Sequence, residues 1–310
     1  MTPPPFRVGW IGTGRMGAAL VHRLLDAGHD VAVYNRTRSK TDALAEHGAK
    51  IVDAPVDLAG RDVVFIMVSG SADMTHVTTG EGGLLTDPAA VPRIVVDSST
   101  VSPQSSADAR ARAEARGARF LAAPVSGNPK VVRAGRLTLA VSGPRDAYDE
   151  VIGLLLALGR GATYLGDGEV ARLAKICHNV FLGVVIQSLT EITLLAERGG
   201  TTRAAFLEFL NDSVMGSIFT RYKSPALVNL DFTPTFTMPL LKKDFDLAYD
   251  VAHDLDVPMP LASAAAQLVA SAVGAGHREL DFATLILEQA RRAGMTLESE
   301  NAEVDDGLST

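Results

Sequence analysis

The feature that most constrains this chain is a long apolar stretch without proline, which runs from Gly166 to Arg198. Glycines open it, and Gly199 and Gly200 close it. A helix of on the order of 30 residues would extend for ~45 Å. Because most of its positions are apolar, most of its circumference must be buried. The stretch therefore predicts a long core helix with a separate part of the chain on either side.

Polar residues break up the apolar run of this stretch. They stand at Lys175, His178, Asn179, Gln187 and Glu191. A membrane-spanning helix needs ~20 consecutive, mainly apolar residues. The interruptions therefore predict that the stretch is not a membrane span.

Two of these polar residues, Lys175 and Asn179, stand four positions apart and so share one face of the predicted helix. One interpretation is a lysine that reaches solvent and an asparagine that bonds a neighbouring loop. The other is a proton donor and its orienting partner. The pair alone leaves both open.

Before the long stretch, short β-rich runs alternate with helical patterns. The predicted strands are 6–12, 30–35, 62–68, 93–99, 119–125 and 137–143. The runs near 62 and 94 are almost continuously apolar, as expected for strands covered on both faces. This alternation predicts a mainly parallel sheet with right-handed crossovers, the Rossmann type of α/β fold.

After Gly200 only helical patterns follow. They cover about 201–211, 214–223, 239–255, 261–274 and 280–293. The predicted organisation is a dinucleotide-binding domain over 1–165, an interdomain helix over 166–200 and an all-helical domain over 201–295. The acidic end, residues 296–310, is poor in apolar residues and is predicted to be a disordered tail.

The composition narrows the function classes. The net charge of −7 disfavours nucleic acid and anionic membranes as partners. The single cysteine, Cys177, favours a reducing compartment, and the N-terminus lacks the pattern of a signal peptide. The seven histidines are scattered, and we expect no metal site. These features predict a cytoplasmic protein.

The first chemical motif is Gly12-Thr13-Gly14-Arg15-Met16-Gly17, which follows an apolar run and opens a helical one. In this context GxGxxG is the dinucleotide fingerprint. The glycines allow a tight turn and let a pyrophosphate approach backbone N–H groups at the helix N-terminus. The motif predicts a dinucleotide site, with an ordinary strand–helix turn as the weaker alternative.

The next predicted strand ends in Asn35, Arg36, Thr37 and Arg38. A site for NAD usually places an acid here to bind the adenosine ribose. Arginine and threonine suit a 2′-phosphate instead. The residues predict NADP as the cofactor, with NAD as the alternative.

Two further blocks follow strand ends, where the crevices of such sheets open. One begins at Asp97 and includes Thr100, and its serines can also cap the helix that starts near Ser102. The other is Ser126-Gly127-Asn128, whose hydroxyl and N–H groups can bind a carboxylate, although by itself this segment predicts no more than a turn.

Taken together, five segments resemble the β-hydroxyacid dehydrogenase family, which includes 3-hydroxyisobutyrate dehydrogenase, tartronate semialdehyde reductase and 6-phosphogluconate dehydrogenase. They read GTGRMG, DSSTVSP, APVSG, LAKICHN and LLKKDFDLA, and they extend over roughly residues 6–295. The resemblance implies an NADP-dependent oxidoreductase that interconverts a small 3-hydroxy acid and its aldehyde or keto acid. It also implies a homodimer or homotetramer.

The resemblance assigns roles residue by residue. Lys175 is the catalytic general acid/base, and Asn179 helps to hold the substrate. The implied substrate-binding residues are Ser126, Gly127, Asn128 and Lys243, and Lys243 reaches the site from the helical domain. The implied cofactor-binding residues are Gly12, Gly14, Arg15, Met16, Gly17, Asn35, Arg36, Thr37, Val68, Thr100 and Lys243.

The chain also departs from the family pattern. Ala122 stands in place of an aspartate, Asn128 in place of a glycine, and His178 in place of an asparagine. Bulky Val131 and Val132 follow in the same loop. These departures affect the expected choice of substrate but not the expected chemistry. His178 is interpreted equally as a substrate contact or as a histidine that is hydrogen-bonded on the other side of the helix. The alternative functions are an imine reductase, a group that usually lacks the lysine, and a non-catalytic NADP-binding scaffold.

Overall fold

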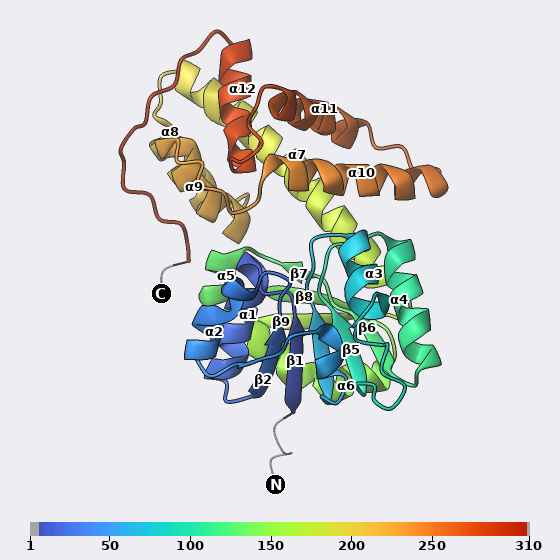
Figure 1. Cartoon of the computed structure of the whole chain (residues 1–310). Helices are drawn as coiled ribbons and strands as arrows, with labels where there is room; N and C mark the ends of the chain where they lie inside the picture. Colours follow the sequence, from blue (N-terminus) through green and yellow to red (C-terminus); the bar gives the residue numbers. More distant parts are fainter. Residues whose placement is uncertain (1–5, 309–310) are drawn as a thin grey trace. The chain divides into compact units, whose positions relative to one another are not determined.

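The chain divides into two compact units, Met1–Lys175 and Ile176–Thr310, and the boundary lies inside helix α7 (Val170–Arg198). The computed structural model describes residues 6–308. Figure 1 shows an α/β layered unit formed by the first part of the chain and an all-helical unit formed by the second.

The first unit is built on a nine-stranded sheet, counted over the described residues. Its order is β3-β2-β1-β4-β5-β6-β8-β7, with β9 paired to β8. The bounds are β1 (Arg7–Ile11), β2 (Asp30–Tyr34), β3 (Lys50–Ile51), β4 (Val63–Ile66), β5 (Ile94–Asp97), β6 (Arg119–Ala122), β7 (Val125–Ser126), β8 (Thr138–Ser142) and β9 (Gly161–Gly166). Strands β1 to β6 pair in parallel, whereas β8 is antiparallel to β6 and β7. From β1 the chain adds β2 and β3 on one side, and it then returns to add β4, β5 and β6 on the other side. The switch point therefore lies between β1 and β4, and ligands of such sheets bind at this point.

Helices cover both faces of this sheet. They are α1 (Arg15–Asp26), α2 (Asp42–Glu46), α3 (Ser71–Thr79), α4 (Pro103–Ala115), α5 (Pro129–Arg133) and α6 (Arg145–Leu158), with short 3₁₀ turns η1 (Arg38–Thr41) and η2 (Pro55–Leu58). Alternate residues of β4 belong to two separate cores: Val63 and Phe65 to one, Val64 and Ile66 to the other. This explains the continuously apolar sequence of the central strands.

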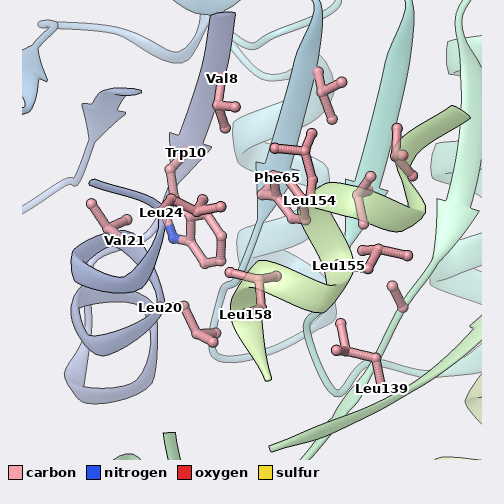
Figure 2. Close-up of a cluster of buried hydrophobic side chains, with 14 of the residues drawn as sticks. Val8, Trp10, Leu20, Val21, Leu24, Phe65, Leu139, Leu154, Leu155 and Leu158 are labelled. Atoms are coloured by element: carbon pink, nitrogen blue, oxygen red, sulfur yellow. The ribbon is translucent and has the colours of Figure 1, made fainter. Parts of the chain in front are cut away.

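Figure 2 shows the core on one face of the sheet, where leucines of α1 and α6 lie against β1 and β4. Trp10 stacks on Phe65 at a ring-centroid distance of 5.0 Å. The Trp10 indole N–H also donates to the carbonyl of Gly12, at 2.9 Å. The core thereby holds the start of the glycine turn in place.

The α/β fold class predicted from the sequence is confirmed, and the six predicted strands correspond to β1, β2, β4, β5, β6 and β8. The sequence analysis missed β3, β7 and β9. Two of these have only two residues, and β9 contains glycine at both ends. A run of two residues carries too little periodicity to be recognised, and glycine is depleted in strands, which masks β9.

The second unit consists of helices around one apolar core. They are most of α7, with α8 (Arg203–Asp212), α9 (Ile218–Asn229), α10 (Met238–Asp254), α11 (Pro260–Gly274), the 3₁₀ turn η3 (Phe282–Thr284) and α12 (Leu285–Arg292). By length and composition alone α7 could cross a membrane, and half of its most apolar window is buried. Ile186, Leu189 and Leu194 of α7 belong to the helical core. This burial accounts for the apolar sequence.

Helix α9 differs from the prediction. The sequence analysis ended it at 223, before Pro225, but the helix continues through this proline to Asn229. Proline in a helix costs a hydrogen bond and strains the preceding turn. The next turn carries Leu227 and Val228, both fully buried, so tertiary packing outweighs the local preference.

The acidic end of the chain also differs from the predicted disordered tail. Residues 296–308 form an extended segment with defined hydrogen bonds, and residues 309–310 of the predicted tail lie outside the described residues. The carboxylate of Glu300 accepts the backbone N–H groups of Arg203 and Ala204, at 2.7 and 3.0 Å, at the start of α8. A carboxylate is stabilised at a helix N-terminus, which explains why this polar segment is held.

Candidate functional site

The turn between β1 and α1 forms the cradle that GxGxxG predicts. Gly12 has a φ of +96°, and a Cβ on it would lie 2.1 Å from the carbonyl oxygen of Met67. A Cβ on Gly17 would lie 2.0 Å from the carbonyl oxygen of Gly12. Both positions therefore require glycine, the first for the turn and the last for close packing of helix and strand.

Gly14 has a different role in this turn. It is the N-cap residue of α1, no side chain caps the helix, and a Cβ at this position would meet nothing within 4 Å. The first N–H groups of a helix have no partners within the helix and attract anions. Open space at an uncapped N-terminus of a twelve-residue helix fits a dinucleotide pyrophosphate.

The residues after β2 split into two groups. Asn35 holds the loop together, because its Oδ1 accepts the N–H of Thr13 at 2.9 Å and its Nδ2 donates to the carbonyl of Thr37 at 2.9 Å. Arg36 is exposed and pairs with Asp73 of α3 at 2.9 Å. Arg38 pairs with Asp53, and both side chains are exposed. The arginines are thus accessible, whereas the asparagine is engaged within the protein.

The ends of β4 and β5 are joined by hydrogen bonds. The N–H of Val68 donates to Ser99 Oγ at 2.9 Å, and the N–H of Ser99 donates to Asp97 Oδ1 at 2.9 Å. Ser102 Oγ accepts the N–H of Ser105, which makes Ser102 the N-cap of α4. These bonds fix the loop that carries Thr100 at the carboxyl edge of the sheet.

Ser126, Gly127 and Asn128 form a tight turn between β7 and α5. Gly127 has a φ of +144°, and a Cβ on it would lie 2.9 Å from Val131 Cγ1. Asn128 is buried, and its Oδ1 caps α5 by accepting the N–H of Val131 at 3.1 Å. The asparagine that departs from the family pattern therefore shapes the turn through its own side chain.

Lys175 lies in the first two turns of α7 and is partly buried. Arg172, one turn earlier, is bonded to the end of β5: its Nη2 donates to the carbonyl of Asp97 at 2.9 Å and pairs with the Asp97 carboxylate. Burial raises the pKa of the Asp97 carboxyl, and the guanidinium of Arg172 opposes that shift. The helix that carries Lys175 is therefore tied directly to the sheet.

In the second unit, Asn179 is buried and its Nδ2 donates to Asp244 Oδ2 at 2.5 Å. Asn179 Oδ1 and His178 Nδ1 lie 2.9 Å apart, so these neighbours share a hydrogen bond. Lys243 Nζ lies 3.3 Å from Asp244 Oδ1. These predicted residues thus form one polar cluster around Asp244.

Two family models match the chain consecutively. Residues 7–166 match the NAD binding domain of 6-phosphogluconate dehydrogenase, and residues 166–288 match the NAD-binding domain of NADP-dependent 3-hydroxyisobutyrate dehydrogenase. The chain belongs to the β-hydroxyacid dehydrogenase family. This confirms the resemblance that the five sequence segments indicated.

Individual members of the family align over nearly the whole chain. Glyoxylate/succinic semialdehyde reductase 1 of Arabidopsis thaliana is 30% identical, over 90% of this chain and 96% of its own. The solved structure of Mycobacterium tuberculosis 3-hydroxyisobutyrate dehydrogenase with L-serine is 28% identical, with a TM-score of 0.80, and the match covers 92% of this chain and 99% of that one.

A third relative differs in length. Cytokine-like nuclear factor N-PAC of Xenopus tropicalis is 30% identical over 91% of this chain, and the match covers 53% of the relative. The chain thus spans about half the length of this and the other N-PAC relatives it matches.

Members of the β-hydroxyacid dehydrogenase family bind a nicotinamide dinucleotide, and the β1–α1 cradle fits one. When bound, such a cofactor supplies or accepts a hydride. Within residues 6–308 no group of three or more His, Cys, Asp or Glu side chains is placed to hold a metal ion.

The sequence analysis missed three side chains that hold predicted site residues in place: Asp97 and Arg172 in the first unit, and Asp244 in the second. Asp97 lies in the DSSTVSP segment and Asp244 in the LLKKDFDLA segment, but only Thr100 and Lys243 of these segments were predicted to be binding residues. Arg172 stands three residues before Lys175 in an apolar stretch, and a charged residue there is itself a signal for a buried partner.

Proposed function

We propose that the chain is an NADP-dependent oxidoreductase that interconverts a small 3-hydroxy acid and its aldehyde or keto acid. The observation that carries the proposal is the anchoring of Lys175. The helix bearing it is bonded through Arg172 to the end of β5, in the same unit as the glycine turn. A lysine held beside the carboxyl edge of a dinucleotide-binding sheet suits a general acid/base.

In this proposal Lys175 protonates the alkoxide oxygen that forms when the substrate carbonyl is reduced, and it accepts the hydroxyl proton in the reverse direction. Ser126 and the backbone N–H groups of the following turn bind the substrate carboxylate. Asn179 keeps a fixed orientation through its bond to Asp244. We further propose that the protein is cytoplasmic and that Lys243 contributes to substrate or cofactor binding.

The proposal is tested by NADPH oxidation with a panel of small aldehyde acids, including glyoxylate, succinic semialdehyde and methylmalonate semialdehyde. We expect turnover with at least one of them. Turnover with cyclic imines alone would indicate an imine reductase. Tight NADPH binding without turnover on either panel would indicate a non-catalytic binding protein.

We expect Arg36→Ala to lower the preference for NADPH over NADH roughly ten- to a hundredfold. A multidentate arginine–phosphate contact contributes ~1.5–3 kcal/mol to binding. The substitution removes this contribution for NADPH only, because NADH has no 2′-phosphate. The measurement is kcat/KM with each cofactor. Arg7→Ala is the matched control, because Arg7 is also exposed and paired with an aspartate but lies at the amino end of β1. Equal kcat/KM values for NADPH and NADH in the wild type would refute the assignment. A preference for NADPH that Arg36→Ala leaves unchanged would refute it as well.

We expect the protein to be at least a dimer in solution. The helical unit leaves large apolar side chains 70% exposed or more, among them Phe181 and Leu195 of α7. These two stand fourteen residues apart and so lie on nearly the same side of the helix. Sedimentation at micromolar concentration should show a dimer or tetramer, and Phe181→Glu with Leu195→Glu should weaken it. A wild-type monomer would contradict the proposal.

A further inference from the structure

A buried arginine–aspartate pair joins two segments of the first unit that are far apart in the sequence. Arg172 of α7 is 1% exposed and Asp97 of β5 is 0% exposed. The guanidinium pairs with the Asp97 carboxylate and donates to the backbone carbonyls of Asp97 and Ser99. Its Nε donates to Ser106 Oγ at 3.1 Å. One side chain thus bonds β5, the loop after it and α4.

The start of α7 has further anchors to the same unit. The N–H of Ala171 donates to Ser142 Oγ at 3.1 Å, and that hydroxyl donates to the carbonyl of Gly168 at 2.7 Å. Arg110 of α4 pairs with Glu169 at 2.8 Å and donates to the carbonyl of Gly168 at 2.8 Å. The helix therefore begins at a position set by β8 and α4 as well as by β5.

The spacing of this pair points to catalysis. Lys175 follows Arg172 by three residues, which is one helical turn, and Thr100 follows Asp97 by three residues at the carboxyl edge of the sheet. Every bond that Arg172 makes in this network therefore fixes the first turns of α7 relative to β5, to the loop after β5 that carries Thr100, or to α4.

We propose that Arg172 and Asp97 are positioning residues that set the distance between Lys175 and the β5–α4 loop. The inference rests on the proposed function, in which Lys175 is the general acid/base. Arg172 acts only through the backbone that it holds.

Stability alone is a weak reason to bury such a pair. Removing two charges from water is costly, and a buried ion pair can often be replaced by apolar residues without loss of stability. Apolar residues cannot replace the planar, fork-shaped guanidinium group of Arg172, which bonds a carboxylate and two carbonyls in one fixed geometry. A displacement of ~1 Å in a catalytic group can lower a rate ~10²-fold.

The decisive variant is Arg172→Lys, which keeps the charge and removes the fork. We expect kcat to fall ~10–100-fold, while KM for the acid and Kd for NADPH change less than about threefold. The primary isotope effect with 4-deuterated NADPH should rise, because the chemical step becomes slower. A kcat within about twofold of the wild type would overturn the inference.

Arg203→Lys is the matched control for the loss of a buried fork. Arg203 is fully buried, pairs with Glu197 and donates to the carbonyls of Val228 and Glu298, all in the second unit. We expect this control to lower Tm by an amount similar to Arg172→Lys but to leave kcat per folded molecule unchanged. Equal losses of kcat in the two variants would show that the effect of Arg172 is only structural.

The charge-free double variant Arg172→Met with Asp97→Leu separates positioning from stability. We expect Tm to recover relative to Arg172→Met alone and kcat to stay low; recovery of both would overturn the inference. A wild type that turns over no substrate would refute the proposed function instead. Amide exchange then decides the positioning role, because Arg172→Lys should accelerate exchange over residues 170–179, and unchanged exchange would overturn it.

Discussion

Replacing Lys175 by methionine should lower the rate of carbonyl reduction ~10²–10⁴-fold and leave NADPH binding intact. General acid/base catalysis by a positioned side chain contributes this factor, and methionine keeps an unbranched apolar stem without the titratable nitrogen. Lys175 is only partly buried, so the fold should tolerate the change. The measurements are kcat/KM with the best substrate and Kd for NADPH by fluorescence.

The control for this prediction is Lys50→Met. Lys50 is an exposed lysine of β3, in the same unit, that pairs with Asp30 at 2.9 Å at the amino end of β2. It should retain the wild-type rate. Near-normal turnover of Lys175→Met with an aldehyde acid would contradict the proposal that Lys175 is the general acid/base. A variant that retains NADPH binding but no longer turns over any acid would separate the dehydrogenase from the non-catalytic alternative.

Local signals in the sequence were sufficient for the sheet and the cofactor cradle. The continuously apolar runs of β4 and β5 and the glycines of the β1–α1 turn each report a constraint that acts on a few neighbouring residues. The backbone of Gly12 confirms the reason for its glycine, since its φ is +96°. Such constraints can be recognised without knowing what packs against them.

Pairings across long separations could not be predicted in this way. Asp97 and Arg172 are 75 residues apart, and Asn179 and Asp244 are 65 apart. No spacing rule connects such partners, because the crossovers that bring them together are set by the whole fold. The prediction of a disordered acidic tail differs from the structure for the same reason. The composition of the tail suggests disorder, but Glu300 accepts a hydrogen bond from Arg203, 97 residues away, at the start of α8.

Replacing Asp281 by asparagine should destabilise the helical unit by ~3–5 kcal/mol at pH 7. Asp281 and Lys223 are both buried, and Lys223 Nζ lies 2.5 Å from Asp281 Oδ1. The carboxylate also accepts the N–H groups of Thr235, Phe236 and Ala283. Removing one partner of a buried pair leaves an uncompensated charge, which is the costly case. Urea unfolding followed by circular dichroism measures the loss.

Asp246→Asn is the matched control in the same unit. Asp246 pairs with Lys242 at 2.7 Å, but both side chains are exposed, and an exposed pair of this kind contributes ~0–1 kcal/mol. A loss below ~1 kcal/mol in Asp281→Asn, or equal losses in the two variants, would contradict the argument that burial makes the difference.

The destabilisation by Asp281→Asn should also depend on pH. Burial alone would raise the pKa of Asp281, but the ammonium of Lys223 and the hydrogen-bond donors outweigh it and lower the pKa below its ordinary value of 3.8. The native state therefore binds fewer protons than the unfolded state in acid, so the stabilisation is complete above about pH 4 and is lost as pH falls through the folded pKa. Asparagine does not titrate. The difference in unfolding free energy between wild type and Asp281→Asn should accordingly be larger at pH 7 than near pH 2, and a difference that grew on acidification would show that the native state does not favour the ionised carboxylate.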